Sequence, residues 1–381
     1  MLSCAPVSAE RHLEFVEAQR DNHRPVAVSS LQVPSWGKVK PEWTHESLGW
    51  FDGQVMVGVG LVLYRRAPRT KLCLAYLPEG PAVPWGRYDA AELLKPLLAH
   101  CRLRSAFTVK IGPQVWARRW NSISVKAGLA NEAVHRLGDI PADEANPHAE
   151  ILIDQLRALG WKQDPDTGAG FGDVQPRYVY QVPLRDTEGN ARTEGEVLAG
   201  FNQLWRRNIK KADTAGVVVS IGTPADLPEF HRLYLETAAR DGFVGRGLAY
   251  FEQMVRVLSE EDPERITIYL ARLAGRLLAA TTLVRVGHHS WYSYGASADE
   301  GREVRPSNAI QWRMIRDALA AGDDVYDLRG VSDSLDSHDP LVGLMRFKVG
   351  TGGRAQEYVG EWDFPLRPLL DKAFRIYLSR R

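Results

Sequence analysis

Short apolar runs alternate with helix-patterned segments along the first half of the chain. The apolar runs occupy residues 55–63 and 72–77, and helical spacing marks residues 90–101 and 149–160. Strands that alternate with helices are typical of a mixed sheet with helices packed on its faces. The pattern therefore predicts an α/β fold built from mixed sheets.

The second half continues the alternation after a Gly-, Asp- and Pro-rich stretch at 164–176, which we expect to be a surface loop. A strand-like run at 178–184 leads into a helix over 193–215, which Gly216 ends. The elements predicted beyond it are a strand at 217–221, helices at 225–241 and 249–259, strands at 266–273, 277–286 and 290–295, a helix at 307–321 and a strand at 325–328. A chain of 381 residues is too long for one ordinary core, so we expect two domains.

Composition narrows the class of protein. Hydrophobic residues make up 44% of the chain and charged residues 25%, which is typical of soluble globular proteins. The formal net charge of +1 argues against binding nucleic acid by overall charge, so any RNA contact requires a local basic patch. The three cysteines have no disulfide or metal-ligand spacing, and no apolar run approaches the roughly 20 residues that cross a bilayer. These features predict a cytoplasmic protein without a metal site.

A lysine precedes a run of glycines near the C-terminus, in the segment LVGLMRFKVGTGG at 341–353. Lys348 follows an aromatic residue there and comes shortly after the strand-like residues 325–328. A lysine at a strand end can hold a positive charge against a phosphate or a developing oxyanion, while glycines let a substrate approach the backbone. The alternative is an ordinary strand edge with a solvated turn.

Four cations lie within six residues of the predicted helix 193–215. Arg206 and Lys210 are four residues apart, as are Arg207 and Lys211, so each pair shares one outward face of the helix. Such a helix is either simply solvated or a surface for the phosphates of RNA.

Three groups of motifs, in this order, resemble the FemABX family (FemX-like). They are Ser35-Trp36-Gly37-Lys38-Val39-Lys40, then Trp205-Arg206-Arg207-Asn208-Ile209-Lys210-Lys211-Ala212, and then Tyr326-Asp327-Leu328-Arg329-Gly330 with the segment 341–353. This family contains tRNA-dependent aminoacyltransferases that build the interpeptide bridge of bacterial peptidoglycan. The resemblance runs from about residue 30 to the C-terminus.

The resemblance implies two GNAT-like acyltransferase units in tandem, without the coiled-coil hairpin of some members. One unit would occupy 1–182, completed by 360–381, and the other 183–359. The chain lacks the Gln/Arg-x-x-Gly-x-Gly/Ala loop with which relatives bind the pyrophosphate of coenzyme A. We therefore expect no cofactor and a donor other than acetyl-CoA.

The resemblance also implies roles for single residues. Lys348 would stabilise the oxyanion, and Phe347 would shape the channel for the acceptor end of the tRNA. The residues implied in precursor binding are Lys40, Trp36, Arg246, Tyr250 and Tyr294, and those that would contact tRNA are Arg206, Arg207, Lys210 and Lys211. Strand alternation puts Tyr292 on the same face as Tyr294, so either tyrosine could border the stem peptide.

One position departs from the family. Where many members carry Ile-Asp-Pro, this chain has Ile111-Gly112-Pro113. The family's candidate aspartate is therefore absent, and the group that would accept the proton of the acceptor amine is left open.

The implied activity is transfer of an amino acid from aminoacyl-tRNA to an amine of UDP-MurNAc-pentapeptide or lipid II. An enzyme acting on lipid II would also contact the inner membrane leaflet peripherally. No protein partner is indicated. Two alternatives remain: a tRNA-dependent aminoacyltransferase acting on a soluble amine in antibiotic biosynthesis, and a non-catalytic protein that binds precursor or tRNA.

Overall fold

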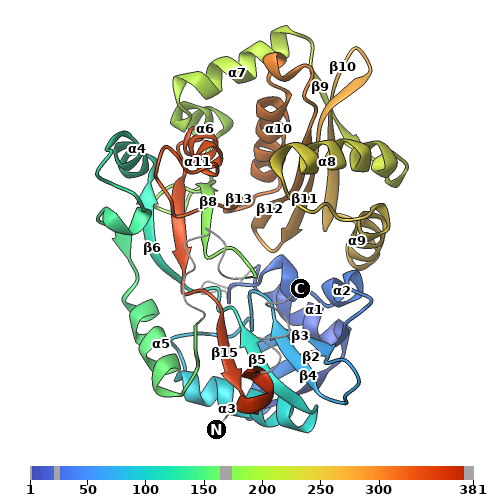
Figure 1. The fold of residues 1–381 in the computed structure, drawn as a ribbon, viewed down its shortest axis with the longest axis vertical. Helices are drawn as coiled ribbons and strands as arrows, with labels where there is room; N and C mark the ends of the chain where they lie inside the picture. Colours follow the sequence, from blue (N-terminus) through green and yellow to red (C-terminus); the bar gives the residue numbers. More distant parts are fainter. Residues whose placement is uncertain (1, 21–25, 164–173, 373–381) are drawn as a thin grey trace. The chain divides into compact units, whose positions relative to one another are not determined.

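The computed structural model describes residues 2–20, 26–163 and 174–372, which divide into two compact units (Figure 1). Unit 1 comprises Met1–Arg119, Glu144–Tyr178 and Gln356–Arg381, and unit 2 comprises Trp120–Asp143 and Val179–Ala355. The predicted boundaries put residues 120–143 in the first unit, but in the structure these residues pack with the second unit. The chain therefore passes between the units four times, where the predicted boundaries at 182/183 and 359/360 imply two passages. Most of the loop predicted at 164–176 lies outside the described residues.

Unit 1 is built on a six-stranded sheet in the order β1-β2-β3-β4-β5-β15. Its elements are β1 (Ser3–Val7), α1 (Ala9–Ala18), α2 (Pro34–Val39), β2 (Thr44–Asp52), β3 (Val55–Arg66), β4 (Cys73–Leu77), α3 (Ala90–Leu103), β5 (Ala106–Ile111), α5 (Pro147–Ala158) and β15 (Trp362–Pro365). Strands β4 and β5 are parallel, and the other neighbours are antiparallel. Trp50 of β2, Leu93 of α3 and Leu156 of α5 belong to one buried core, which joins these helices to the sheet.

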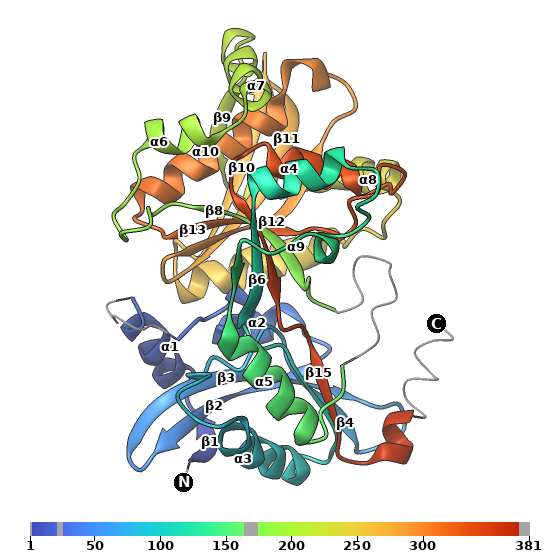
Figure 2. The same ribbon diagram turned by 90° about the vertical axis from the view of Figure 1, so that its left-hand side faces the viewer.

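Unit 2 carries the strand order β8-β13-β12-β11-β10-β9. Its elements are α4 (Ser122–Ala130), β8 (Tyr178–Pro183), α6 (Glu194–Gly200), α7 (Gln203–Thr214), β9 (Val218–Gly222), α8 (Leu227–Asp241), α9 (Leu248–Glu261), β10 (Ile266–Leu273), β11 (Arg276–Val286), β12 (His289–Ser297), α10 (Pro306–Ala320), β13 (Val325–Gly330) and α11 (Val342–Val349). Figure 2 shows α8 and α10 on opposite faces of this sheet. The passages between units fall in β6 (Trp116–Asn121), before β7 (Glu144–Ala145), in β8 and in β14 (Arg354–Tyr358).

The two units repeat one topology. Unit 1 runs β1-α1-α2-β2-β3-β4-α3-β5, and unit 2 runs β9-α8-α9-β10-β11-β12-α10-β13. In both, the first four strands are antiparallel and the strand after the third helix pairs in parallel with the fourth. The predicted fold class, α/β with two tandem acyltransferase-like units, is confirmed.

The helix predicted over 193–215 is in fact two helices. The side chain of Asn202 accepts a hydrogen bond from the backbone N–H of Trp205 at 2.8 Å and so caps a new helix, α7, after α6 has ended. An Asn that caps the next helix competes with continued helical hydrogen bonding. Trp205 is buried at 3% exposure, while Leu204 is 54% exposed, so the tryptophan is the core residue of this turn.

Candidate functional sites in the two units

Lys348 is buried in unit 2. It lies in the last turn of the helix α11, so the expectation of a lysine at a strand end is wrong. The side chain is 3% exposed, and its Nζ donates to the carbonyl oxygens of Gly330 at 2.7 Å and Arg329 at 3.2 Å. Burial lowers the pKa of Lys348 to about 7, although the nearby charge of Asp327 acts in the opposite direction. The side-chain amine of Lys348 is thus protonated in part of the molecules near neutral pH, and the buried site leaves little room for water around it.

The glycines that follow Lys348 pack against unit 2 itself. A β-carbon at Gly350 would stand 2.1 Å from the ring of Trp205, and one at Gly352 would stand 1.9 Å from the carbonyl oxygen of Gly200. Gly352 also has a φ of +69°, which favours glycine. The expectation that these glycines admit a substrate is therefore wrong, because the chain already fills the space beside them.

Helix α7 is fastened to the lysine-bearing helix α11. The indole Nε1 of Trp205 donates to the carbonyl oxygen of Phe347 at 2.8 Å, and the two rings lie 4.7 Å apart. The backbone N–H of Asn202 donates to the carbonyl oxygen of Gly350 at 2.9 Å. Because of these bonds, the half-buried Phe347 and the basic helix α7 hold fixed positions relative to Lys348.

The cations of α7 divide into two groups. The guanidinium of Arg206 turns back to the carbonyl oxygens of Ala199 and Phe201 at the end of α6, so it does not project outward as predicted. Arg207, Lys210 and Lys211 line a hollow of about 510 Å³. Arg305, which precedes α10, lines the same hollow and was not found by sequence analysis. Four cations therefore surround this hollow.

Arg246, Tyr250 and Tyr294 come together in unit 2. The guanidinium carbon of Arg246 lies 5.2 Å from the centre of the Tyr250 ring, and the hydroxyls of Tyr250 and Tyr294 are 2.9 Å apart. Burial, reinforced by the neighbouring Tyr294, raises the pKa of Tyr250, so its hydroxyl stays protonated and can donate. The arrangement offers one cation and two hydroxyls to a polar ligand.

Tyr292 does not join this group. A β-bulge interrupts the pairing of β11 with β12 between Thr281 and Leu283, so the strict alternation assumed for the two tyrosines fails. The Tyr292 hydroxyl lies where a β-carbon of Gly295 would stand, while the Tyr294 ring contacts Phe251 at 5.1 Å. The expectation that the two tyrosines share one face is therefore wrong.

Lys40 belongs to unit 1, where it caps the end of α2. Trp36 on that helix is only 7% exposed and packs in the interior, which argues against the substrate contact predicted for it. Trp43 is half-buried and closes a turn with Lys40, since its backbone N–H donates to the Lys40 carbonyl oxygen at 3.0 Å. The backbone of Trp43 is therefore held next to Lys40, while its ring lies 6.4 Å from the ring of Tyr76 and 5.7 Å from the guanidinium carbon of Arg65. Sequence analysis missed Trp43 because it follows the motif that ends at Lys40.

Two glutamates flank Gly112 in unit 1. A β-carbon at Gly112 would lie 3.2 Å from the backbone nitrogen of Glu79 and 3.5 Å from the Cγ of Glu361. Glu79 has a φ of +51°, and this tight turn brings its backbone against position 112. Glycine at 112 therefore relieves crowding, and the carboxylate of Glu361 lies where a side chain from that position would point.

Hydrogen bonds hold the Glu361 carboxylate in place. Its Oε1 accepts from the hydroxyl of Tyr76, and its Oε2 accepts from the backbone N–H of Val174 at 2.7 Å. Glu361 is 3% exposed and shares a small hollow with Gly112 and Arg177. The ammonium nitrogen of Lys110 lies 4.0 Å from the same Oε2, so the carboxylate also faces a cation. No sequence motif marked Glu361, because its relation to Gly112 arises only in the folded sheet.

Metal and membrane-spanning sites were also considered. In the part of the chain that the structure describes, no three His, Cys, Asp or Glu side chains gather to hold a metal ion. None of the described helices is both long and apolar enough to cross a membrane.

The sequence matches the FemAB family over residues 9–276 and 273–378, which together are most of the chain. The chain belongs to the FemAB family. Its relatives in that family include a lipid II:glycine glycyltransferase of Staphylococcus saprophyticus, 24% identical over 98% of both chains. The protein of the same name from Staphylococcus aureus is 23% identical, over 92% of this FemAB-family chain and 94% of its relative.

Solved structures agree with this fold. FemX superposes with a TM-score of 0.76 and 20% identity, over 97% of this chain and 99% of FemX. A tandem GNAT protein from the clavulanic acid biosynthesis pathway superposes with a TM-score of 0.51 and 13% identity, over 96% and 99% of the two chains. At these identities the likeness establishes the FemAB-type tandem fold.

Proposed function

We propose that this FemAB-family protein transfers an amino acid from aminoacyl-tRNA to an amine of a peptidoglycan precursor, either lipid II or UDP-MurNAc-pentapeptide. The proposal places the enzyme in the cytoplasm, at the inner membrane leaflet when the acceptor is lipid II. Support comes from the staphylococcal relatives, which are named lipid II:glycine glycyltransferases and align along nearly the whole chain. The observation that carries the chemistry is the buried cation of Lys348.

Lys348 suits the charge that this reaction develops. The ester of aminoacyl-tRNA is already activated, so the acceptor amine attacks its carbonyl carbon without an enzyme nucleophile. Negative charge then appears on the carbonyl oxygen and disappears when the ribose hydroxyl leaves. A fixed cation stabilises this charge more strongly in a water-poor site than in bulk water. Lys348 is such a cation, because backbone carbonyls hold it and, in the described part of the chain, no carboxylate forms an ion pair with it.

The tRNA would lie along α7. Arg207, Lys210, Lys211 and Arg305 supply a cluster of charge in a chain whose net charge is only +1. Phosphates of a folded RNA bind such clusters largely through release of counterions. The fastening of Trp205 to Phe347 supports this placement, since it couples the basic helix to the helix that bears Lys348.

Changing Arg206, Arg207, Lys210 and Lys211 together to Gln should weaken tRNA binding and flatten its dependence on salt. Three of the four face the hollow, so the slope of log affinity against log salt should fall by about three. A filter-binding titration at several salt concentrations measures this slope. The matched control replaces Arg136, Arg232, Arg256 and Arg276, four exposed cations elsewhere in unit 2, and should leave the slope unchanged. Equal slopes in both variants would show that α7 is only a solvated face.

Each unit offers its own candidate contact for the precursor: Arg246 with Tyr250 and Tyr294 in unit 2, and Lys40 in unit 1. A guanidinium binds two oxygens of a diphosphate at once, and one hydroxyl of the Tyr250–Tyr294 pair can donate to a third, since the other hydroxyl donates within the pair. The half-buried Trp43 beside Lys40 offers a flat surface for an apolar or sugar group. The contact of each of these groups with the precursor is a separate proposal, and binding measurements on single variants test each one.

Arg246→Ala and Lys40→Ala should each weaken precursor binding with the fold intact. Loss of one charge-assisted partner costs about 1.5–3 kcal/mol, which is roughly a 10- to 150-fold loss of affinity. Calorimetric titration with UDP-MurNAc-pentapeptide measures it. Arg256→Ala on α9 and Lys38→Ala on α2 are exposed neighbours that should bind normally. Wild-type affinity in both test variants would remove the diphosphate assignment.

The function itself is tested by incubating the protein with charged total tRNA and each precursor, followed by mass spectrometry. A gain equal to one or more aminoacyl residues on a precursor supports the proposal. Precursor that binds but keeps its mass would identify a binding protein. A product formed only on a soluble amine would identify the antibiotic-tailoring type of enzyme.

A further inference from the structure

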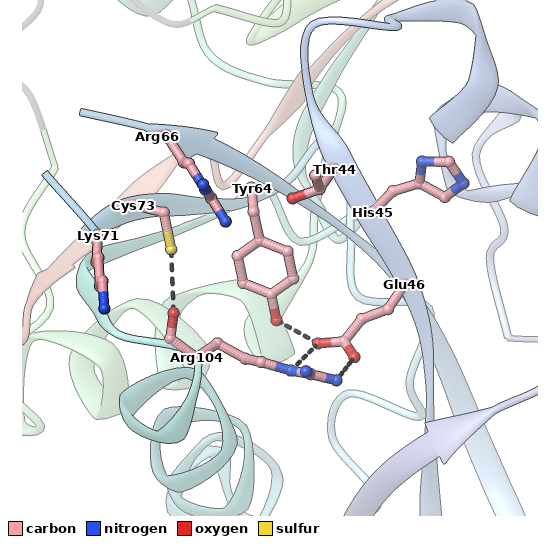
Figure 3. Close-up of a pocket in the computed structure, with 8 residues that line it drawn as sticks. All are labelled: Thr44, His45, Glu46, Tyr64, Arg66, Lys71, Cys73 and Arg104. Carbon is pink, nitrogen blue, oxygen red and sulfur yellow. Dashed lines mark hydrogen bonds and ion pairs between the residues drawn. The ribbon is translucent and has the colours of Figure 1, made fainter. Parts of the chain in front are cut away.

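A basic hollow of about 390 Å³ lies in unit 1, beside the turn that joins β3 to β4 (Figure 3). Arg66 comes from the end of β3, Lys71 from the turn, and Arg104 from the residue that caps α3. Figure 3 shows all three side chains around the hollow, with the hydroxyl of Thr44 on another side. None of these residues has a role in the function proposed above.

The one carboxylate in this hollow is already neutralised. Glu46 accepts hydrogen bonds from Tyr64 at 2.5 Å and from His100 at 2.7 Å, and it forms a bidentate ion pair with Arg104. Although burial alone would raise it, these bonds lower the pKa of Glu46 to about 2. Glu46 is therefore ionised, and the guanidinium of Arg104 neutralises its charge.

Arg66 and Lys71 consequently leave the hollow positive. Both are exposed, and neither forms an ion pair with a carboxylate in the described part of the chain. Arg69 in the same turn is also exposed. A local excess of cations in a chain of net charge +1 favours an anionic partner.

An exposed apolar residue precedes Arg104 in the chain. Leu103 is 86% exposed at the end of α3, between Arg102 and Arg104, and Arg104 lines the hollow. A leucine flanked by arginines suits the boundary of a bilayer, where cations meet lipid phosphates and the apolar side chain enters the acyl region. On RNA, by contrast, an aliphatic side chain would gain little. We name Arg66, Arg69, Lys71, Arg102, Leu103 and Arg104 the basic turn.

We propose that the basic turn docks the protein on the anionic phospholipid headgroups of a membrane surface. The inference deepens the proposed function, because a lipid-linked acceptor would require an enzyme without a described membrane-spanning helix to reach the bilayer by another route. The docking itself needs neither tRNA nor precursor. It can therefore be tested independently of transfer.

The test is co-sedimentation with vesicles that contain no precursor, made of phosphatidylcholine alone or of equal parts phosphatidylcholine and phosphatidylglycerol. Wild-type protein should bind the anionic vesicles and not the neutral ones. Each cation near an anionic surface contributes about a 5-fold gain, so Arg66→Gln with Lys71→Gln should weaken binding roughly 25-fold. Leu103→Ser should weaken it about 10-fold. Arg104 is left unchanged, because it holds Glu46 in the fold.

The matched control is Arg207→Gln with Lys211→Gln on α7, which removes the same charge from unit 2. It should retain vesicle binding while tRNA affinity falls, and the basic-turn variant should show the reverse. Loss of tRNA affinity in the basic-turn variant would make this surface an RNA contact and overturn the proposal. Unchanged vesicle binding in that variant, or equal binding to neutral vesicles, would overturn it as well. The transfer assay with the nucleotide-linked precursor needs no membrane, so its outcome is independent of the vesicle result.

Discussion

Lys348→Met should lower turnover by roughly 10²–10³, the scale that removal of one oxyanion-stabilising donor produces. Met keeps the length of the apolar stem and removes the ammonium. If the charge acts on the oxyanion, it matters more in the transition state than in either ground state, so precursor and tRNA affinities should change little. Single-turnover rates with charged tRNA, measured beside binding constants, separate the two effects.

Arg346→Met is the matched control, since Arg346 is an exposed cation on the same helix. It should turn over at the wild-type rate. Melting temperatures check the fold of both variants, because Lys348→Met removes the donor from the carbonyl oxygens of Arg329 and Gly330. Normal turnover of a folded Lys348→Met variant would make this lysine a purely structural side chain. Lost precursor affinity instead would assign it to ligand binding.

The pKa of Lys348 gives the same hypothesis a dependence on pH. Because burial lowers this pKa to about 7, the protonated fraction falls as pH rises through neutrality. The wild-type rate with saturating substrates should therefore contain a factor that decreases above about pH 7, and the residual rate of Lys348→Met should lack it. If the rate of the Lys348→Met variant still decreases above about pH 7, the decrease reports the titration of another group.

Local patterns in the sequence predicted the elements of the fold, whereas its duplication was predicted only through the resemblance to a family. The strand at 266–273 and its neighbours were placed closely, because apolar runs and helical spacing are local signals. The repeat of β1 to β5 in β9 to β13 is a matter of strand order and direction. A repeated strand order requires only that each element place hydrophobic residues on the face that it buries. Many sequences meet this requirement, so the two units share no recognisable sequence repeat.

The errors at the candidate site share a physical cause. The segment 341–353 was read as a strand edge because its glycines suggested a turn, but Gly343 and Gly350 are tolerated at the two ends of α11. Glycine is required after Lys348 because the backbone there lies against Trp205 and Gly200, which are far away in the sequence. The bulge in β12 likewise depends on pairing with β11. Tertiary contacts, which no local pattern contains, decided each of these points.

Glu361→Gln should lower turnover by about 10²-fold, at the lower end of what one general base supplies. An acceptor amine is protonated at neutral pH and must lose protons during the reaction. Glu361 is a carboxylate beside Gly112, at the position where the family's aspartate is missing. Gln keeps the size of the side chain, and its one carbonyl oxygen can still accept from the backbone N–H of Val174 while its NH2 group donates to the hydroxyl oxygen of Tyr76. Binding of tRNA and precursor should therefore remain, and the loss should appear in the rate.

Asp323→Asn controls for the loss of a buried carboxylate, because Asp323 lies in unit 2, accepts from the hydroxyl of Ser290, pairs with Arg285 at 3.4 Å and does not line the hollow beside Gly112. It should leave the rate nearly unchanged if the fold is intact. Adding Gly112→Asp to Glu361→Gln returns a carboxylate to the same place and should recover part of the rate. Recovery is limited, since the new β-carbon stands 3.2 Å from the Glu79 nitrogen and the turn must give way. If Glu79→Gln alone lowers the rate and Glu361→Gln does not, the base is Glu79. If neither variant is slower, the proton leaves through water.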